Sequence, residues 1–189
     1  DVLVTELTKR KINPERIRNV FLGLNDGLVE ILGAVSGFFG AFGSARLVLI
    51  AALTTAVAGA LSMAAGSFLA LSSEKEVKTT EVARKIFLGE ESDVTPMEES
   101  PLRSAIVVGV AYVTGALVPV MPVLIGAKDA LFSVFTAGLM VIFVSTILSF
   151  LSGMDIKRRI VLNLVIITLA VSVSYAIGLA AKQIWGIEV

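Results

Sequence analysis

The chain has 189 residues, of which 56% are hydrophobic and only 17% are charged, and its formal net charge is zero. Soluble domains carry about 25% charged residues, so this composition indicates a membrane protein, and the balanced charge gives no support for a nucleic-acid partner. The chain has neither cysteine nor histidine, which excludes disulfides, thiolate or imidazole metal ligands, and enzymes that use a cysteine nucleophile or a histidine base.

Five apolar runs are each long enough to cross the hydrocarbon layer of a membrane, which takes about 20 helical residues. We therefore predict an all-α membrane protein with a single transmembrane domain, residues 1–189, and spans near 20–42, 46–72, 103–125, 129–152 and 158–182. A short acidic insert, 73–102, separates the second and third spans. Its first half, up to Leu88, has the composition of a helix that continues the second span.

Lysine and arginine are unequally distributed between the two ends of these spans. Thirteen precede the first span or lie in the segments between spans two and three and between spans four and five, whereas three lie in the other loops and after the last span. Because basic residues concentrate on the cytoplasmic side of a membrane, we expect the N-terminus and the insert in the cytoplasm and the C-terminus outside.

The first predicted span carries two carboxylates, Asp26 and Glu30, which share one helix face because they are four residues apart. A charged side chain in the membrane interior costs about 2.5–3.5 kcal/mol on insertion scales, so this face should line a bundle interior, a water-filled path or a cation site. The short loop after this span makes the second span its antiparallel neighbour. At a rise of about 1.5 Å per residue, similar depths are reached by Met63, with Ser62, Ser67 and Asn25 as supporting candidates.

Two carboxylates and a thioether suit a divalent first-row ion such as Fe²⁺ or Mn²⁺, whereas carboxylates alone would serve Mg²⁺ or Ca²⁺ equally well. A carboxylate in this setting can also exchange a proton for a metal ion. Structural roles stay open for Met63, as a packing residue, and for Asp26, as a helix-capping residue, but Glu30 has no comparable structural role. The insert is either a solvated linker or a weak cation collector, for which the candidates are Glu81, Glu90, Glu91, Asp93, Met97, Glu98 and Glu99.

Three parts of the chain resemble the vacuolar iron transporter family. The matching motifs are Gly23–Val29 for its first helix, Ala58–Leu71 with Ser73–Glu76 for its second, and Pro101–Ala105 with Gly115–Pro122 for its third. The resemblance implies a five-helix dimer that moves Fe²⁺, and often Mn²⁺, out of the cytosol in exchange for protons. It also implies that Asp26 and Met63 contact the metal in a path at the dimer interface.

The chain departs from this family pattern at two positions. Many members have a glutamate where this chain has Ser67, and a small or hydroxyl residue where it has Glu30. We interpret Glu30 as a ligand relocated from the second helix to the first at a nearby depth. The insert is much shorter than the cytoplasmic domain of plant-type members, which favours a prokaryotic-type protein of the cell membrane.

Taken together, these patterns predict a transporter rather than an enzyme, without a cofactor and with Fe²⁺ or Mn²⁺ as its substrate. Its expected partners are the lipid bilayer, divalent ions, protons and a second copy, which would meet the first helix where Gly33 and Gly37 permit close approach. The alternatives are a carrier of another cation or of a small polar solute, and a non-transporting membrane subunit or scaffold whose carboxylates pair with a partner's basic residues.

Overall fold

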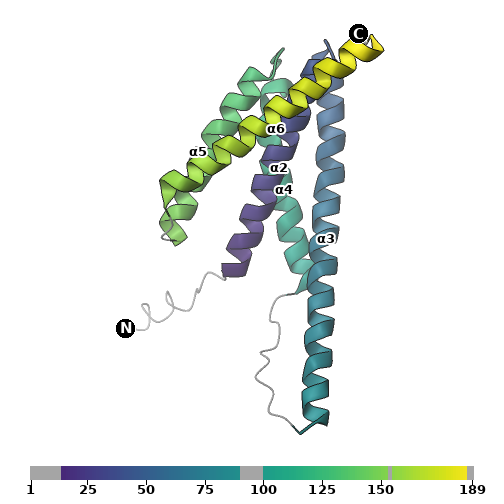
Figure 1. The fold of residues 1–189 in the computed structure, drawn as a ribbon, viewed down its shortest axis with the longest axis vertical. Coiled ribbons are helices and arrows are strands. Elements are labelled where there is room, and N and C mark those ends of the chain that lie inside the picture. The colour runs from purple at the N-terminus through teal and green to yellow at the C-terminus, as the bar shows by residue number, and fades with distance from the viewer. Residues whose placement is uncertain (1–13, 90–99, 153–154, 187–189) are drawn as a thin grey trace.

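The computed structural model describes residues 14–89, 100–152 and 155–186. Within these ranges the chain forms five α-helices and no strands (Figure 1). The helices are α2 (Pro14–Ala41), α3 (Ala45–Phe87), α4 (Pro101–Leu124), α5 (Leu131–Ser152) and α6 (Ile156–Trp185). Helices α2, α3, α4 and α6 are long and apolar enough to cross a membrane by length and composition, and α5 carries a shorter apolar stretch, Leu131–Ile147. The predicted all-α membrane class is confirmed.

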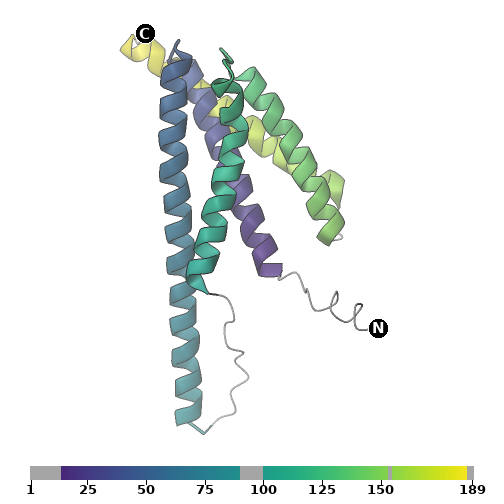
Figure 2. The same ribbon diagram turned by 180° about the vertical axis from the view of Figure 1, so that it is seen from behind.

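Helix α2 is the centre of the bundle, because it contacts each of the other four helices. Helices α3 and α4 lie on one side of it, and α5 and α6 lie on the other (Figures 1 and 2). Each side has its own apolar cluster of buried residues. The first, shared with α3 and α4, comprises Ile31, Val35, Val48, Ala52, Tyr112, Ala116, Val120 and Val123. The second, shared with α5 and α6, comprises Leu28, Leu32, Ala137, Val141 and Ile167.

Glycines let α2 and α4 approach so closely that their backbones touch. A Cβ added at Gly23, Gly27 or Gly115 would collide with the backbone of the facing helix. Small residues at four-residue spacing commonly provide such close helix contacts in membranes. This contact fixes the register between α2 and α4, and therefore which α4 side chains reach the polar face of α2.

The face of α2 that carries Gly33 and Gly37 packs against α6 of the same chain. A Cβ at either glycine would lie within 3.0–3.2 Å of Ser174. The glycine spacing predicts a second copy of the protein on this face, whereas the structure places α6 there. A four-residue spacing of small residues does not specify which helix will pack against them.

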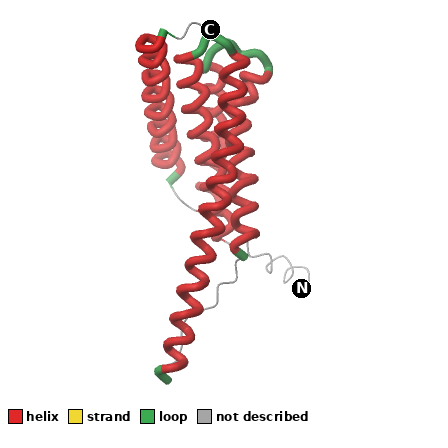
Figure 3. Tube along the Cα trace, turned by 90° about the vertical axis from the view of Figure 1, so that its right-hand side faces the viewer, coloured by secondary structure: helices red, strands yellow, loops and turns green. Residues whose placement is uncertain are grey.

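Helix α3 is 43 residues long and continues well past the ends of its neighbours (Figure 3). The continuation through Phe87 is as predicted from the composition of the insert. Its solvated surface carries two ion pairs at four-residue spacing, Glu74 with Lys78 and Glu81 with Lys85. Such exposed pairs contribute only a few tenths of a kcal/mol each, so we regard them as helix support.

Candidate functional site

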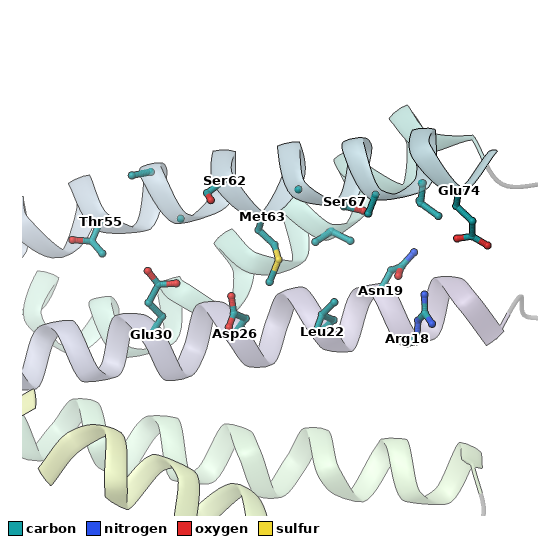
Figure 4. Close-up of a pocket in the computed structure, with 16 residues that line it drawn as sticks. Arg18, Asn19, Leu22, Asp26, Glu30, Thr55, Ser62, Met63, Ser67 and Glu74 are labelled. Atoms are coloured by element: carbon teal, nitrogen blue, oxygen red, sulfur yellow. The ribbon is translucent and has the colours of Figure 1, made fainter. Parts of the chain in front are cut away.

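A groove of about 710 Å³ runs between α2 and α3, with Val108 of α4 also contributing to its wall. On α2 it is lined by one helix face with four-residue spacing, namely Arg18, Leu22, Asp26 and Glu30, together with Asn19. On α3 the polar and sulfur-bearing lining residues are Thr55, Ser62, Met63, Ser67 and Glu74 (Figure 4). One groove thus contains five of the residues proposed from sequence: Asp26, Glu30, Met63, Ser62 and Ser67.

Two further sequence candidates, Asn25 and Glu81, do not line this groove. Asn25 is half-buried and is not among the residues that line it. Glu81 is exposed on the α3 continuation, where its carboxylate lies 3.9 Å from the Lys85 ammonium. Six further candidates fall outside the described residues, namely Glu90, Glu91, Asp93, Met97, Glu98 and Glu99.

The polar groups of the groove follow one another along the helix axis. Met63 extends from α3 toward α2 beside Asp26, Glu30 lies one turn further on near the level of Thr55, and Arg18 and Glu74 lie at the opposite end (Figure 4). Asp26 and Glu30 remain exposed to the groove. In the part of the chain that the structure describes, neither carboxylate has a basic side chain within ion-pair distance.

Among the residues that the structure describes, Glu30 has one hydrogen-bond partner, which comes from α4. The hydroxyl of Tyr112 donates a hydrogen bond to Oε2 of Glu30 at 2.8 Å, and Tyr112 is completely buried. Tyr112 is not among the residues proposed from the sequence. A lone tyrosine in a mostly apolar span is a weak signal, and without the α2–α4 register nothing links it to a residue 82 positions away.

A second polar cluster joins three helices nearer the Arg18 end of the groove. Nδ2 of Asn19 donates to the buried hydroxyl of Ser104 at 2.8 Å, and that hydroxyl lies 3.3 Å from the hydroxyl of Ser67. Ser67 is therefore at the level of Asn19, eleven residues before Glu30, which corresponds to roughly 16 Å along α2.

The prediction that Ser67 lies at a depth near that of Glu30 is thus wrong. The prediction places the end of the second span near Leu71, whereas α3 continues without a break to Phe87. The end of the apolar run is consequently not the end of the helix, and it is a poor reference for depth.

The chemistry of the groove follows from these groups. Two carboxylates and a thioether, with neutral hydroxyls around them, offer a cation a few ligands rather than a closed cage. Among the described residues, no group of three or more acidic side chains is placed so that it could hold a metal ion. Few ligands and an open groove favour a cation that binds transiently over one that is held permanently.

Comparison with known proteins gives an independent result. The model of the VIT family matches residues 17–88 and 84–179. "Vacuolar iron transporter homolog 1" of Oryza sativa subsp. japonica is 32% identical over 108 residues, covering 56% of this chain and 46% of the relative. "Vacuolar iron transporter" of Centaurea cyanus is 35% identical over 86 residues, covering 46% and 34%. "Vacuolar iron transporter 1" of Arabidopsis thaliana is 25% identical over 178 residues, covering 69% and 71%. The chain spans about half the length of most of the curated relatives it matches.

Proposed function

The chain belongs to the VIT family, and on this premise we propose that it carries a divalent metal ion, Fe²⁺ or Mn²⁺, out of the cytosol in exchange for protons. Named relatives of this chain are transporters rather than enzymes, and their names give iron as what is transported rather than as a bound cofactor. We therefore treat the metal ion as a substrate of this chain as well.

The observation that carries the proposal is the meeting of Asp26, Glu30 and Met63 in one groove. The carboxylates supply charge for a divalent ion, and the thioether adds a soft ligand that Fe²⁺ tolerates better than Mg²⁺ or Ca²⁺ do. Ser62, beside Met63 in the same wall, offers a neutral oxygen. This combination favours a first-row transition metal over the hard alkaline-earth ions.

Proton exchange is supported by the absence of a counter-charge for the two carboxylates in the described part of the chain. Unpaired anions within a membrane are costly. A metal ion neutralises Asp26 and Glu30 when it binds, and protons can do so when it leaves. Binding of the metal ion therefore displaces protons, and binding of protons displaces the metal ion. This mutual displacement is the basis of an antiporter.

We propose that the start of α2 and the continuation of α3 face the cytoplasm. The described basic residues near that side include Arg18, Arg84, Lys85 and Arg103, which agrees with the positive-inside rule. The end of the groove that holds Arg18 and Glu74 would then be its cytoplasmic mouth. The short segment between α3 and α4 favours a prokaryotic-type member, in which outward transport crosses the cell membrane.

We further propose a two-fold dimer in which the grooves of two copies face each other. Asp26 and Glu30 are exposed on the single chain, and contact with lipid would be costly for both. A second copy on this face would cover the carboxylates of both subunits through one self-complementary contact.

Mn²⁺ uptake into proteoliposomes under an imposed pH gradient tests the transport proposal. Wild-type protein should couple Mn²⁺ movement to proton movement, and Asp26→Asn and Glu30→Gln should each lower the uptake rate at least tenfold, since they remove charge with little change of volume. Asp155→Asn and Glu76→Gln are matched controls outside the groove that should transport normally. Asn caps a helix about as well as Asp, so the Asp155 control should preserve its cap on α6.

Two outcomes would contradict the proposal. Wild-type protein without metal-dependent proton flux would favour the scaffold alternative. Normal uptake by both Asp26→Asn and Glu30→Gln would place the transport site elsewhere.

A further inference from the structure

Tyr112 is buried between three helices, and its hydroxyl contacts Glu30, one of the residues that line the groove. Its ring belongs to the apolar cluster that α2, α3 and α4 share, and the side chain has no exposed surface. Its hydroxyl nevertheless ends 2.8 Å from Oε2 of Glu30. A phenylalanine would fill the same space in the cluster, so packing alone does not explain the hydroxyl.

Two glycines on different helices fix where this hydroxyl lies. A Cβ at Gly27 of α2 would collide with the Tyr112 carbonyl, and a Cβ at Gly59 of α3 would collide with the Tyr112 hydroxyl. The backbone of Tyr112 is therefore set against α2 and its phenol is set against α3. Contacts at both the backbone and the phenol of Tyr112 therefore fix the position of the oxygen that bonds to Glu30.

Helix α4 has no carboxylate, yet one of its faces supports the groove along its length. Ser104, Val108 and Tyr112 follow one another at four-residue spacing, and all three are buried. Ser104 bonds to Asn19 of α2 near one end of the groove, Val108 lines its wall, and Tyr112 bonds to Glu30 further along. The hydroxyl of Tyr112 is consequently part of a rigid support for the α2 face.

We propose that Tyr112 is a positioning residue for the transported cation, which holds Glu30 with one carboxylate oxygen hydrogen-bonded and the other oxygen free to bind the ion. This inference rests on the proposed function. A free glutamate loses considerable rotamer freedom when it is fixed. A side chain that is already held pays less of that entropy when the ion arrives, so the affinity rises.

Mn²⁺ titration of the purified full chain in detergent, followed by calorimetry, tests the inference. Tyr112→Phe removes only the hydroxyl and should weaken Mn²⁺ binding about tenfold, because hydrogen bonds to charged groups are among the strong ones. Tyr175→Phe changes the second tyrosine of the chain, which is on α6 and 43% exposed, and should bind Mn²⁺ like the wild type.

A glycine substitution provides a second route to the same effect. Gly59→Ala should displace the phenol and weaken Mn²⁺ binding like Tyr112→Phe, while leaving both Tyr112 and Glu30 in the chain. Gly138→Ala on α5 is the matched control, because a Cβ there meets nothing within 4 Å.

A double-mutant cycle separates positioning from general packing. In a Glu30→Gln background, Mn²⁺ is raised to millimolar concentrations so that residual binding by Asp26 and Met63 can be measured. In this background, Tyr112→Phe should not lower the Mn²⁺ affinity further. Unchanged Mn²⁺ affinity in Tyr112→Phe would overturn the inference, and so would an equal loss with and without Glu30. If Asp26→Asn loses binding in the same experiment while Tyr112→Phe does not, only the positioning role fails. If wild type and Asp26→Asn bind Mn²⁺ equally, the proposed function fails with it.

Discussion

At the scale of single residues, we propose that Met63 sets which ions the groove prefers. It is half-buried and packs against the α2–α3–α4 cluster, so Met63→Leu keeps apolar volume and should leave the fold intact. Among the described residues that line the groove, Met63 supplies the only sulfur, and the substitution removes it. We expect Fe²⁺ and Mn²⁺ uptake to fall several-fold in proteoliposomes, while any Ca²⁺ uptake stays as in wild type.

Met140→Leu is the control for this prediction, because Met140 packs against the other apolar cluster, away from the groove. If both variants transport all ions at the wild-type rate, Met63 contributes packing only. The preference for transition metals would then have to come from oxygen ligands alone.

The local part of the site could be predicted from the sequence, and the non-local part could not. Asp26 and Glu30 share a face because of helix geometry, and a short loop brings α3 alongside, so Met63 could be placed near them. Tyr112 and Ser104 enter the site through the α2–α4 register, which depends on backbone contacts at Gly27 and Gly115 that no spacing rule specifies.

At the scale of the elements, the α2–α4 contact should be sensitive to a single methyl group. A Cβ at Gly115 would collide with the Leu24 carbonyl, which belongs to the backbone and cannot rotate away. We expect Gly115→Ala to destabilise the protein by about 1–3 kcal/mol, as overpacking usually does. The measurement is the thermal unfolding midpoint in detergent, with Gly138→Ala as the control that should shift it little.

An unchanged midpoint for Gly115→Ala would show that α4 can move away from α2 at no cost. In that case the hydrogen bond between Tyr112 and Glu30 should weaken as well, since it depends on the same register. Mn²⁺ binding measured on Gly115→Ala would detect this.

Apolar run length predicted the helices well, but not their neighbours. The continuation of α3 through Phe87 could be predicted, because helix-forming residues follow the apolar run without a glycine or proline until Gly89. The helix that packs against Gly33 and Gly37 could not be predicted, because α6 and a second copy of α2 would both contact the same small residues. Run length gives the helices, and only the packed bundle tells which faces are already occupied.

At the scale of the whole molecule, the surfaces of the bundle differ in polarity. The outer faces of α5 and α6 expose large apolar side chains such as Phe135, Phe143, Leu169 and Ile177, which is expected for helices that meet lipid. The groove between α2 and α3 instead exposes Asp26 and Glu30. Because lipid is a poor environment for these carboxylates, we expect this face to be covered when the protein is in the membrane.

A second copy is the cover that we propose, and the Cys-free chain allows a direct test of it. Leu22 lies on the groove face of α2 and is 55% exposed, whereas Ile177 belongs to α6 and is 64% exposed. In a two-fold contact, a residue near the axis meets its own copy. Leu22→Cys should therefore form disulfide-linked dimers in native membranes after mild oxidation, and Ile177→Cys should not.

Positions such as Val35, which are buried inside one chain, should also fail to cross-link. A monomeric mass in mild detergent, together with no cross-link at Leu22→Cys, would contradict the dimer, and the carboxylates would then need a different cover.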